Sequence, residues 1–417
     1  MPKWGFFALS IQLVLVFFAP PIALASKQIF LSDLWMLVWV AFASILIIKQ
    51  FCTASQASLE PAPQAPHSFF VFFICTGLLL VLVYAHGYFR PDLESLFNPH
   101  GFYLVKNELK TEAAHFQPLR EFIHCVRYFS WILAAWITFH WFCYPLSKTN
   151  VIIFKKLQKI LLVCLALSGS FSILAKLSPT IKKILGQIYN YNPNYEYWAD
   201  RIYGVFSSPV EASACFLFGF VLFYSSPFAS PFNKVLACVF TFLGARLAHT
   251  FFPFFGLLVA LGIPMWVKLS KKHKALTLSI SVLLMTNIFF LYKSVFLAKL
   301  ENLHSRWIGW KVYLDALFSR LDFLLLGFGF IPIHSDNSYF FLLSRGGVLL
   351  FLCCMGWMLL KLKTYWKYWP LKTSMILVYL LVTGLGLDIL IFRHVVVLLV
   401  TIAIPLLALK YSKRSPV

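Results

Sequence analysis

The chain has 417 residues, of which 60% are hydrophobic and only 12% are charged. Because charged residues make up about a quarter of a typical soluble domain, this composition excludes a water-soluble globular protein. The formal net charge of +21 would suit nucleic-acid binding, but the lysines and arginines lie mainly in short loops between apolar segments, where such residues set membrane topology. We therefore expect a lipid bilayer as the surroundings and no nucleic-acid partner.

Apolar segments of near-spanning length recur along the whole chain. A helix needs about 20 apolar residues to cross the hydrocarbon core and satisfies its own backbone hydrogen bonds there, so the segments indicate about twelve transmembrane helices. The predicted class is all-α, a single polytopic helical bundle over residues 1–417. In chain order the segments are 4–25, 29–48, 68–85, 122–143, 157–177, 203–224, 232–244, 251–267, 275–296, 346–360, 371–390 and 395–409.

The first segment permits two interpretations. Lys3, the apolar stretch and the sequence Ala23-Leu24-Ala25 before Ser26 are similar to a signal peptide with its small-residue cleavage site. The apolar stretch is long for a signal peptide, which favours a retained helix. Cleavage would leave the orientation of the other predicted segments unchanged.

Clusters of basic residues predict the orientation of the bundle, because cytoplasmic loops carry the excess of lysine and arginine. The clusters follow the fourth, eighth, tenth and last segments, which all end on one side, so both termini are expected in the cytoplasm. Three longer loops, 86–121, 178–202 and 297–345, then face the opposite side. The basic residues are Lys148, Lys155, Lys156 and Lys159; Lys268, Lys271, Lys272 and Lys274; Lys361, Lys363, Lys367 and Lys372; and Lys410, Lys413 and Arg414.

Metal and disulfide chemistry are not expected. The nine cysteines fall almost all inside or at the ends of apolar segments and include no C-x-x-C pair, so they are typical of small buried apolar residues. Asp92 and Glu94 in the first long outer loop form a D-x-E pair, a spacing that can hold Mg²⁺. A lone pair of this kind is better explained as solvated loop charge, and we predict no metal and no cofactor.

The outer loop 297–345 and the residues just after it carry most of the groups able to do chemistry. Within the loop, residues 307–326 have apolar side chains at near-helical spacing, which predicts an amphipathic helix lying along the membrane surface. The polar candidates are His304, Arg306, Asp315, Arg320, Asp322, His334, Asp336, Asn337 and Arg345.

This region resembles the membrane-embedded O-antigen ligase and O-antigen polymerase superfamily of bacterial inner-membrane proteins. The resemblance is carried by Ser305-Arg306-x3-Trp310, a helix, Gly327-x-Gly329, a short polar segment, Tyr339 and Gly346-Gly347. Weaker similarity covers 201–209, with its arginine, glycine and proline, and the small-residue-arginine motif 244–246. The twelve-span plan with its large outer loop extends the resemblance to the whole chain.

The resemblance implies glycosyl transfer on the periplasmic face, from a polyprenyl diphosphate-linked glycan to a sugar hydroxyl, without a metal and with inversion. A departing diphosphate develops negative charge, which arginine stabilises with bidentate geometry that lysine lacks. Arg201, Arg246 and Arg306 are the candidates for that role. Either Asp336 or His334 is the candidate general base.

Two further polar residues next to that segment, Asn337 and Tyr339, are expected to contribute to substrate binding. In ligases of this family the polar segment usually reads His-Asn, whereas Asp336-Asn337 occupies that place here and His334 lies two residues earlier. This departure favours a polymerase-type enzyme, whose acceptor is another carrier-linked glycan. A ligase that transfers the glycan to lipid A-core is the alternative. A transporter or flippase without covalent chemistry is the third candidate, although no internal repeat supports it.

Several candidates also have simpler explanations. Arg246 suits an interfacial anchor that extends to water, and Arg201 follows Glu196 and Asp200, which permits a local ion pair. For Asp336 and Asn337 the simpler explanation is turn chemistry. Glu211 lies one turn into the sixth predicted segment, where a carboxylate is costly unless paired or hydrated, so it is a functional candidate by itself.

Overall fold

The computed structural model is built of α-helices, as the sequence predicts, with one small β-hairpin added. Its described residues form fourteen α-helices, a π-helical segment and two short strands. The residues that it describes are 3–24, 27–54, 67–91, 116–143, 148–189, 201–202, 204–206, 208–248, 250–270, 307–308, 310–329, 337–366, 371–385, 387 and 392–412.

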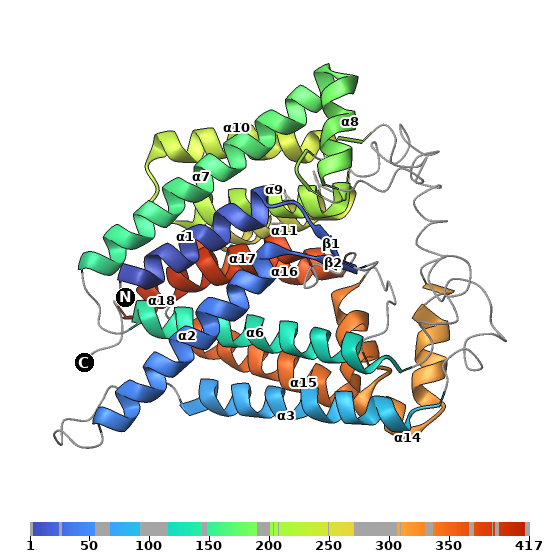
Figure 1. Ribbon diagram of the computed structural model, residues 1–417. Coiled ribbons are helices and arrows are strands. Elements are labelled where there is room, and N and C mark those ends of the chain that lie inside the picture. The colour runs from blue at the N-terminus through green and yellow to red at the C-terminus, as the bar shows by residue number, and fades with distance from the viewer. Residues whose placement is uncertain are drawn as a thin grey trace.

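The long helices run side by side in one bundle, and the first and last helices, α1 and α18, begin and end at the same end of it (Figure 1). The opposite end carries α8, the hairpin and α14, and we name it the outer end because the basic clusters predict it to be non-cytoplasmic. The elements are α1 (Lys3–Phe18), β1 (Ile22–Leu24), β2 (Lys27–Ile29), α2 (Leu31–Ala54), α3 (His67–Phe89), α6 (Pro118–Cys143), α7 (Lys148–Leu177), α8 (Pro179–Ile188), α9 (Pro209–Ser225), α10 (Pro231–Ala248), α11 (Phe251–Lys268), α14 (Leu321–Leu326), α15 (Ser338–Trp366), α16 (Leu371–Gly384), α17 (Arg393–Leu398), η4 (Leu399–Ala403) and α18 (Ile404–Ser412).

Among the described residues, three helical stretches are long and apolar enough to cross a membrane: Pro118–Phe142, Thr149–Leu177 and Ser338–Gly356. Shorter apolar helices accompany them, including α1, α9 and the stretch Arg393–Leu409. This set of helices is that of a multi-pass membrane protein. The predicted ninth span, 275–296, lies outside the described residues.

The first helix is shorter than predicted. It ends at Phe18, because Pro20 and Pro21 have no amide hydrogen to continue the helical hydrogen bonds. The residues that follow form an antiparallel hairpin in which Ile22 pairs with Ile29. Helix α1 is packed inside the bundle: Leu9, Leu13 and Phe17 are fully buried, and α2 is held to it by the bond from Trp35 Nε1 to the carbonyl of Ala8. The first apolar segment is therefore an integral part of the packed bundle.

Two helices in the second half also differ from the prediction. Helix α15 begins at Ser338, eight residues before the predicted 346, and it is kinked at Gly347, where φ is 65° and ψ is −169°. The predicted amphipathic helix 307–326 is divided: residues 310–318 are helical, Ser319 and Arg320 interrupt them, and α14 follows. Apolar side chains of this divided segment differ in exposure: Leu317 and Phe323 are buried, whereas Phe318 is 66% exposed.

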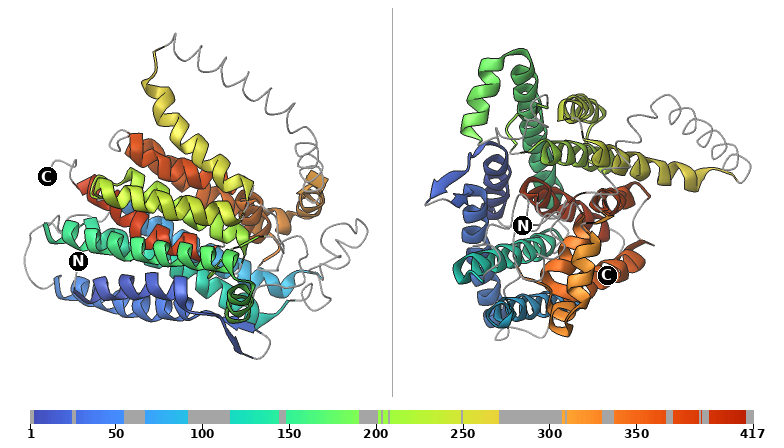
Figure 2. Two further views of the ribbon diagram at one scale, coloured as in Figure 1. Left: turned by 90° about the horizontal axis from the view of Figure 1, so that it is seen from above. Right: turned by 90° about the vertical axis from the view of Figure 1, so that its right-hand side faces the viewer.

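Helix α9 forms the centre of the core, since nearly all of its residues are buried, as expected for a helix that is apolar on every side. The C-terminal helices α16 and α17 pack against it and lie in the middle of the bundle when it is viewed from the outer end (Figure 2, right). Segments from both halves of the chain therefore meet at the outer ends of α9 and α17.

Candidate functional site

In the part of the chain that the structure describes, the acidic residues lie at the outer end. Ionised groups inside an apolar bundle are costly unless they are paired or hydrated, so their presence at a single end marks the place where charge is used. The acidic residues of the described ranges are Asp33, Glu121, Glu211, Asp315 and Asp322.

A backbone hydrogen bond brings the two described candidate arginines to one place. The amide of Ile202 donates to the carbonyl of Leu247 over 3.1 Å, and both residues belong to a small apolar cluster beside α8. Each is the residue that follows a predicted arginine, so Arg201 lies beside the end of α10 that carries Arg246. Arg246 is exposed and Arg201 is half-buried.

The segment after Arg201 turns sharply toward α9. Gly204 has φ of +59°, and a Cβ added there would lie 2.5 Å from Ser172 Oγ on α7, so a side chain would be strained on both counts. Ser208 then caps α9 by accepting a hydrogen bond from the amide of Glu211 over 3.1 Å, and Pro209 occupies the first helical position. The arginine, glycine and proline pattern of 201–209 therefore encodes a turn and a helix start.

Small residues before Arg246 let α10 approach α9 closely. A Cβ added at Gly244 would overlap the Phe216 ring, and Ala245 is fully buried. The small-residue-arginine motif thus fixes the outer end of α10 against the helix that carries Glu211.

Glu211 is paired with a histidine, as expected for a carboxylate whose burial in an apolar setting is energetically costly. Its Oε1 lies 2.7 Å from Nδ1 of His394 on α17, and both side chains are more than 90% buried. With Glu211 ionised, a state in which a carboxylate only accepts hydrogen bonds, Nδ1 of His394 is the donor in this pair. The other nitrogen, Nε2, is buried and has no hydrogen-bond partner among the described residues.

A second ion cluster lies on the neighbouring residue of α17. Asp33 Oδ2 is 3.1 Å from Nε of Arg127 and 3.7 Å from Nε of Arg393, and the Arg393 guanidinium stacks on the ring of Phe30. The cluster joins α2, α6 and α17. Because Arg393 and His394 are adjacent, it is continuous along the chain with the Glu211 pair.

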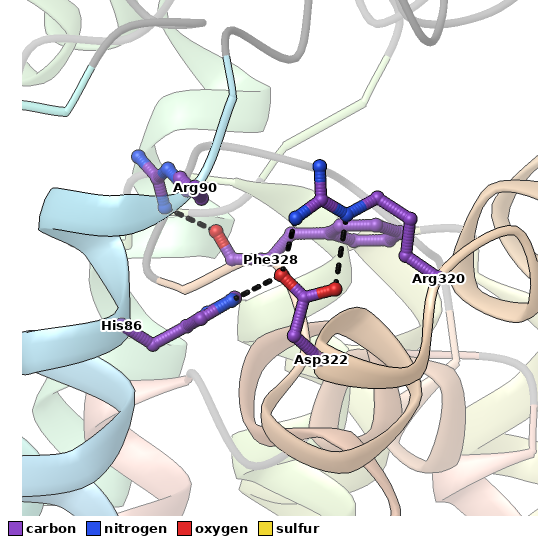
Figure 3. A network of polar contacts seen from close by, with 5 residues as sticks. All are labelled: His86, Arg90, Arg320, Asp322 and Phe328. Atoms are coloured by element: carbon purple, nitrogen blue, oxygen red, sulfur yellow. Dashed lines mark hydrogen bonds and ion pairs between the residues drawn. The ribbon is translucent and has the colours of Figure 1, made fainter.

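A third pair is more deeply buried. The Arg90 guanidinium binds Oε1 of Glu121 through Nη2 and the carbonyl of Phe328 through Nη1 (Figure 3). The exposed fractions of the two side chains are 1% and 2%. Gly329 packs directly on the pair, since a Cβ added there would lie 2.5 Å from Arg90 Nη1. The pair therefore connects the end of α3 and the start of α6 to the G-x-G motif.

Beside it, Asp322 on α14 binds two cationic or donor groups. Its Oδ1 accepts from Arg320 Nε over 3.0 Å, and its Oδ2 lies 3.0 Å from Nε2 of His86 on α3 (Figure 3). The hydrogen bonds from Arg320, and then that from His86, hold the pKa of Asp322 well below its usual range. The carboxylate thus attaches the outer-loop helix α14 to α3.

The lowered pKa of Asp322 predicts how this contact depends on pH. A carboxyl group with a depressed folded-state pKa contributes stability above the unfolded value, about 4, and loses it as the pH falls through the folded value. We therefore expect the coupling between Arg320→Ala and Asp322→Asn, measured as a double-mutant cycle in thermal unfolding, to be retained at pH 5. It should decline only below about pH 4. A coupling already lost at pH 5 would contradict the assignment.

Both glycine motifs of the outer loop are joined through their backbones. The amide of Phe328 donates to the carbonyl of Ser344 over 2.6 Å, and the amide of Gly329 donates to that of Arg345 over 3.1 Å. The kink at Gly347 makes this possible, because it releases these two carbonyls from the regular bonding of α15. Gly327, Gly329 and Gly347 all have positive φ, a conformation that favours glycine.

Asn337 and Tyr339, the predicted substrate-binding residues, make structural hydrogen bonds. Asn337 Oδ1 accepts from the amides of Tyr339 and Phe340, which caps α15, and its Nδ2 donates to the carbonyl of Leu385. The Tyr339 hydroxyl donates to the carbonyl of Leu381 over 2.8 Å. These bonds fix the start of α15 against the end of α16, and a role in binding substrate stays a prediction.

The predicted catalytic residues Arg306, His334 and Asp336 lie outside the described residues. The nearest described residues on either side of His334 and Asp336 are Gly329, whose amide donates to the carbonyl of Arg345, and Asn337, which caps α15. Among the described histidines, cysteines and acids, no group of three is arranged to hold a metal ion.

Sequence reasoning missed several groups that the structure brings together, namely Arg90, Glu121, Arg127, Arg393 and His394. One signal was present: these charged or titratable residues lie within three turns of the outer end of an apolar segment, where an unpaired charge is expensive. The sequence does not indicate which of them form pairs, because each partner comes from a different helix.

The fold and the outer-end clusters define a helical membrane protein with buried ion pairs gathered at one end of its bundle. No known family model and no curated protein matches the sequence.

Proposed function

We propose that the protein transfers a glycan from a polyprenyl diphosphate carrier during assembly of a bacterial surface polysaccharide such as O-antigen. The proposal includes a bundle of about twelve spans in the inner membrane, both termini in the cytoplasm and the outer end facing the periplasm. A polymerase-type reaction, with a second carrier-linked glycan as the acceptor, is favoured by the sequence Asp336-Asn337.

The observation that carries the proposal is the hydrogen bond from Ile202 to Leu247, which brings Arg201 and Arg246 to one place at the outer end. Two guanidinium groups can bind the oxygens of a diphosphate in bidentate fashion and stabilise the charge that develops as it leaves. The lipid tail of such a carrier would stay in the bilayer beside α10. Arg306 is the third arginine that we assign to this task.

In the proposed reaction, a hydroxyl oxygen of the acceptor attacks the anomeric carbon of the donor sugar. The bond from that carbon to the diphosphate oxygen breaks, the diphosphate leaves with the electron pair, and the configuration inverts. The hydroxyl proton passes to a base, for which Asp336 and His334 are the candidates from the sequence. Asn337 and Tyr339 are proposed to help position the substrate, and no step requires a metal or cofactor.

Arg246→Ala should abolish product formation. In a strain of the source bacterium that lacks the wild-type gene, we expect at least a 100-fold loss of polymer, the usual effect of removing a preorganised charge-stabilising donor. Arg246→Lys should restore only part of it, because an ammonium group cannot bind two oxygens side by side. The readout is the polysaccharide ladder on a gel, with the protein level measured by immunoblot.

The matched control is Lys183→Ala, which removes an exposed cation of α8 at the same end and should leave the ladder unchanged. A normal ladder in Arg246→Ala at normal protein level would refute the proposal. Complementation of strains that lack each enzyme separates the two acceptors: restored long chains indicate a polymerase, and restored capping of lipid A-core indicates a ligase. Glycan transport that persists in Arg306→Ala/Asp336→Ala would indicate a transporter.

A further inference from the structure

The Glu211 and His394 pair lies at the level of the candidate arginines. Helices α9 and α10 form an antiparallel pair joined by residues 226–230, and Glu211 and Arg246 are nearly the same number of residues away from that connection. Since both helices rise at the same rate per residue, the two residues lie at similar height in the bundle. His394 is the second residue of α17, and its Nδ1 lies 2.7 Å from Oε1 of Glu211.

Continuous packing connects the pair with the arginines. Phe206 is the fifth residue after Arg201, and its ring centroid is 4.6 Å from that of His394. Phe206 also contacts Phe216 at 5.2 Å, which is the ring against which Gly244 of α10 packs. Phe206 and Phe216 therefore pack between the pair on one side and the outer end of α10 on the other.

The chemistry of the pair suits a proton acceptor. Glu211 holds Nδ1 as a donor, which fixes both the orientation of the imidazole and the identity of the nitrogen that stays free, Nε2. A base oriented by a carboxylate in this way is the general arrangement by which enzymes activate a hydroxyl group. The carboxylate also stabilises the imidazolium that forms when Nε2 takes up a proton.

We propose that His394 is the general base of the transfer reaction and that Glu211 is its positioning residue. This inference rests on the proposed function. It places the general base in the helical bundle, whereas the sequence suggested Asp336 or His334 of the outer loop for that role. The acceptor hydroxyl forms its bond to the anomeric carbon, its proton moves to Nε2 of His394, and the diphosphate leaves with the electrons of the broken bond. The imidazolium then returns its proton to water at the outer end.

A structural role makes a different prediction. If His394 served only to satisfy Glu211, any donor at the position of Nδ1 would suffice. Burying Nε2 without a hydrogen-bond partner costs free energy, and a purely structural role of His394 does not explain that cost. His394→Asn separates these roles, because the asparagine amide nitrogen occupies the place of Nδ1 and can still donate to Glu211, whereas no atom replaces Nε2.

The test uses the full-length protein and two readouts. Polymer is measured in the deletion strain, and binding of undecaprenyl diphosphate without a glycan is measured on purified protein in lipid nanodiscs. For His394→Asn we expect unchanged lipid binding, a midpoint of thermal unfolding close to that of the wild type, and a loss of polymer of at least 100-fold, as for removal of a general base. Glu211→Gln should lose less, because its amide oxygen still accepts from Nδ1.

Each remaining outcome decides one of the two claims. Normal polymer in His394→Asn, together with loss in Asp336→Asn, would overturn the inference and place the base in the outer loop. If His394→Asn loses polymer and also loses lipid binding or thermal stability, His394 has a structural role, and this result also overturns the inference. If the wild-type protein does not bind undecaprenyl diphosphate, or if Arg246→Ala binds it normally, the proposed function itself fails.

Discussion

Glu121→Ala should destabilise the protein by about 3–5 kcal/mol, because it leaves the Arg90 guanidinium buried without its carboxylate. The two side chains are among the least exposed charged groups of the described residues, at 1% and 2%. The substitution also frees the guanidinium that binds the carbonyl of Phe328, so the G-x-G turn should loosen. The midpoint of thermal unfolding in detergent, or the SDS concentration that unfolds half of the protein, measures the effect.

Asp322→Asn is the matched control, since it alters a carboxylate on the same face whose side chain is 34% exposed. Solvent screens that site, and the loss of stability should be much smaller than for Glu121→Ala. The double variant Arg90→Met/Glu121→Leu should recover much of the lost stability, because it removes both charges together. Equal effects of Glu121→Ala and Asp322→Asn would mean that burial of the Arg90 pair does not govern its energetics.

Gly347→Ala should cost about 2–5 kcal/mol, combining a backbone conformation almost restricted to glycine with forced overpacking. The added Cβ would overlap the carbonyl of Leu325 and lie 2.5 Å from the amide nitrogen of Leu326. To relieve this overlap, α14 must move away from α15, which breaks the bonds from Phe328 and Gly329 to the kinked helix. Protein yield, thermal unfolding and polymer formation should all fall.

Gly356→Ala provides the comparison, because it lies in the same helix and a Cβ added there meets no atom within 4 Å. Alanine is the better helix former, so this variant should be as stable as the wild type or slightly more stable. If both variants had the same stability, the kink at Gly347 would not be under the steric constraint that its neighbours impose.

Hydrophobic run length predicted most of the bundle, because the bilayer imposes one length and one composition on every crossing. Predictions failed where that rule does not apply. Pro20 and Pro21 ended α1 inside an apolar run, and the start of α15 was missed because Asn337, Arg345 and Gly347 are typical loop residues. There, Asn337 caps the helix locally, whereas contacts to α16 and α14, which local sequence cannot reveal, hold the start of α15 and its kink in place.

The candidate site was predictable to a smaller extent. Arg201 and Arg246 were singled out because 201–209 and 244–246 resemble motifs of the O-antigen ligase and polymerase superfamily, and a backbone bond between the residues that follow them places them together. Glu211 was singled out by the cost of its charge. Its partner His394 was not, because the pair joins two segments that are far apart in the sequence, and a single sequence contains no information on such a distance.

The two short glycine motifs of the outer loop have a steric role in the structure. The G-x-G and G-G pairs carried part of the family resemblance, and in the structure Gly327 and Gly347 allow two backbones to touch. Glycine is required at these positions for steric reasons, and this requirement does not depend on the chemistry that the outer loop performs. Spacing alone therefore signals the architecture more strongly than it signals the substrate.

The position of Arg393 and His394 has a consequence for biogenesis. Both belong to α17, which leaves the ribosome after the helices that carry Asp33 and Glu211. Until α17 enters the bilayer, Glu211 lacks His394, and Asp33 lacks Arg393 although Arg127 of the earlier helix α6 is present. The nascent chain therefore presents polar side chains that the translocon or a membrane chaperone can bind. Insertion of α17 would then pair these acids and release the folded bundle from the translocon or chaperone, so that release follows the end of synthesis.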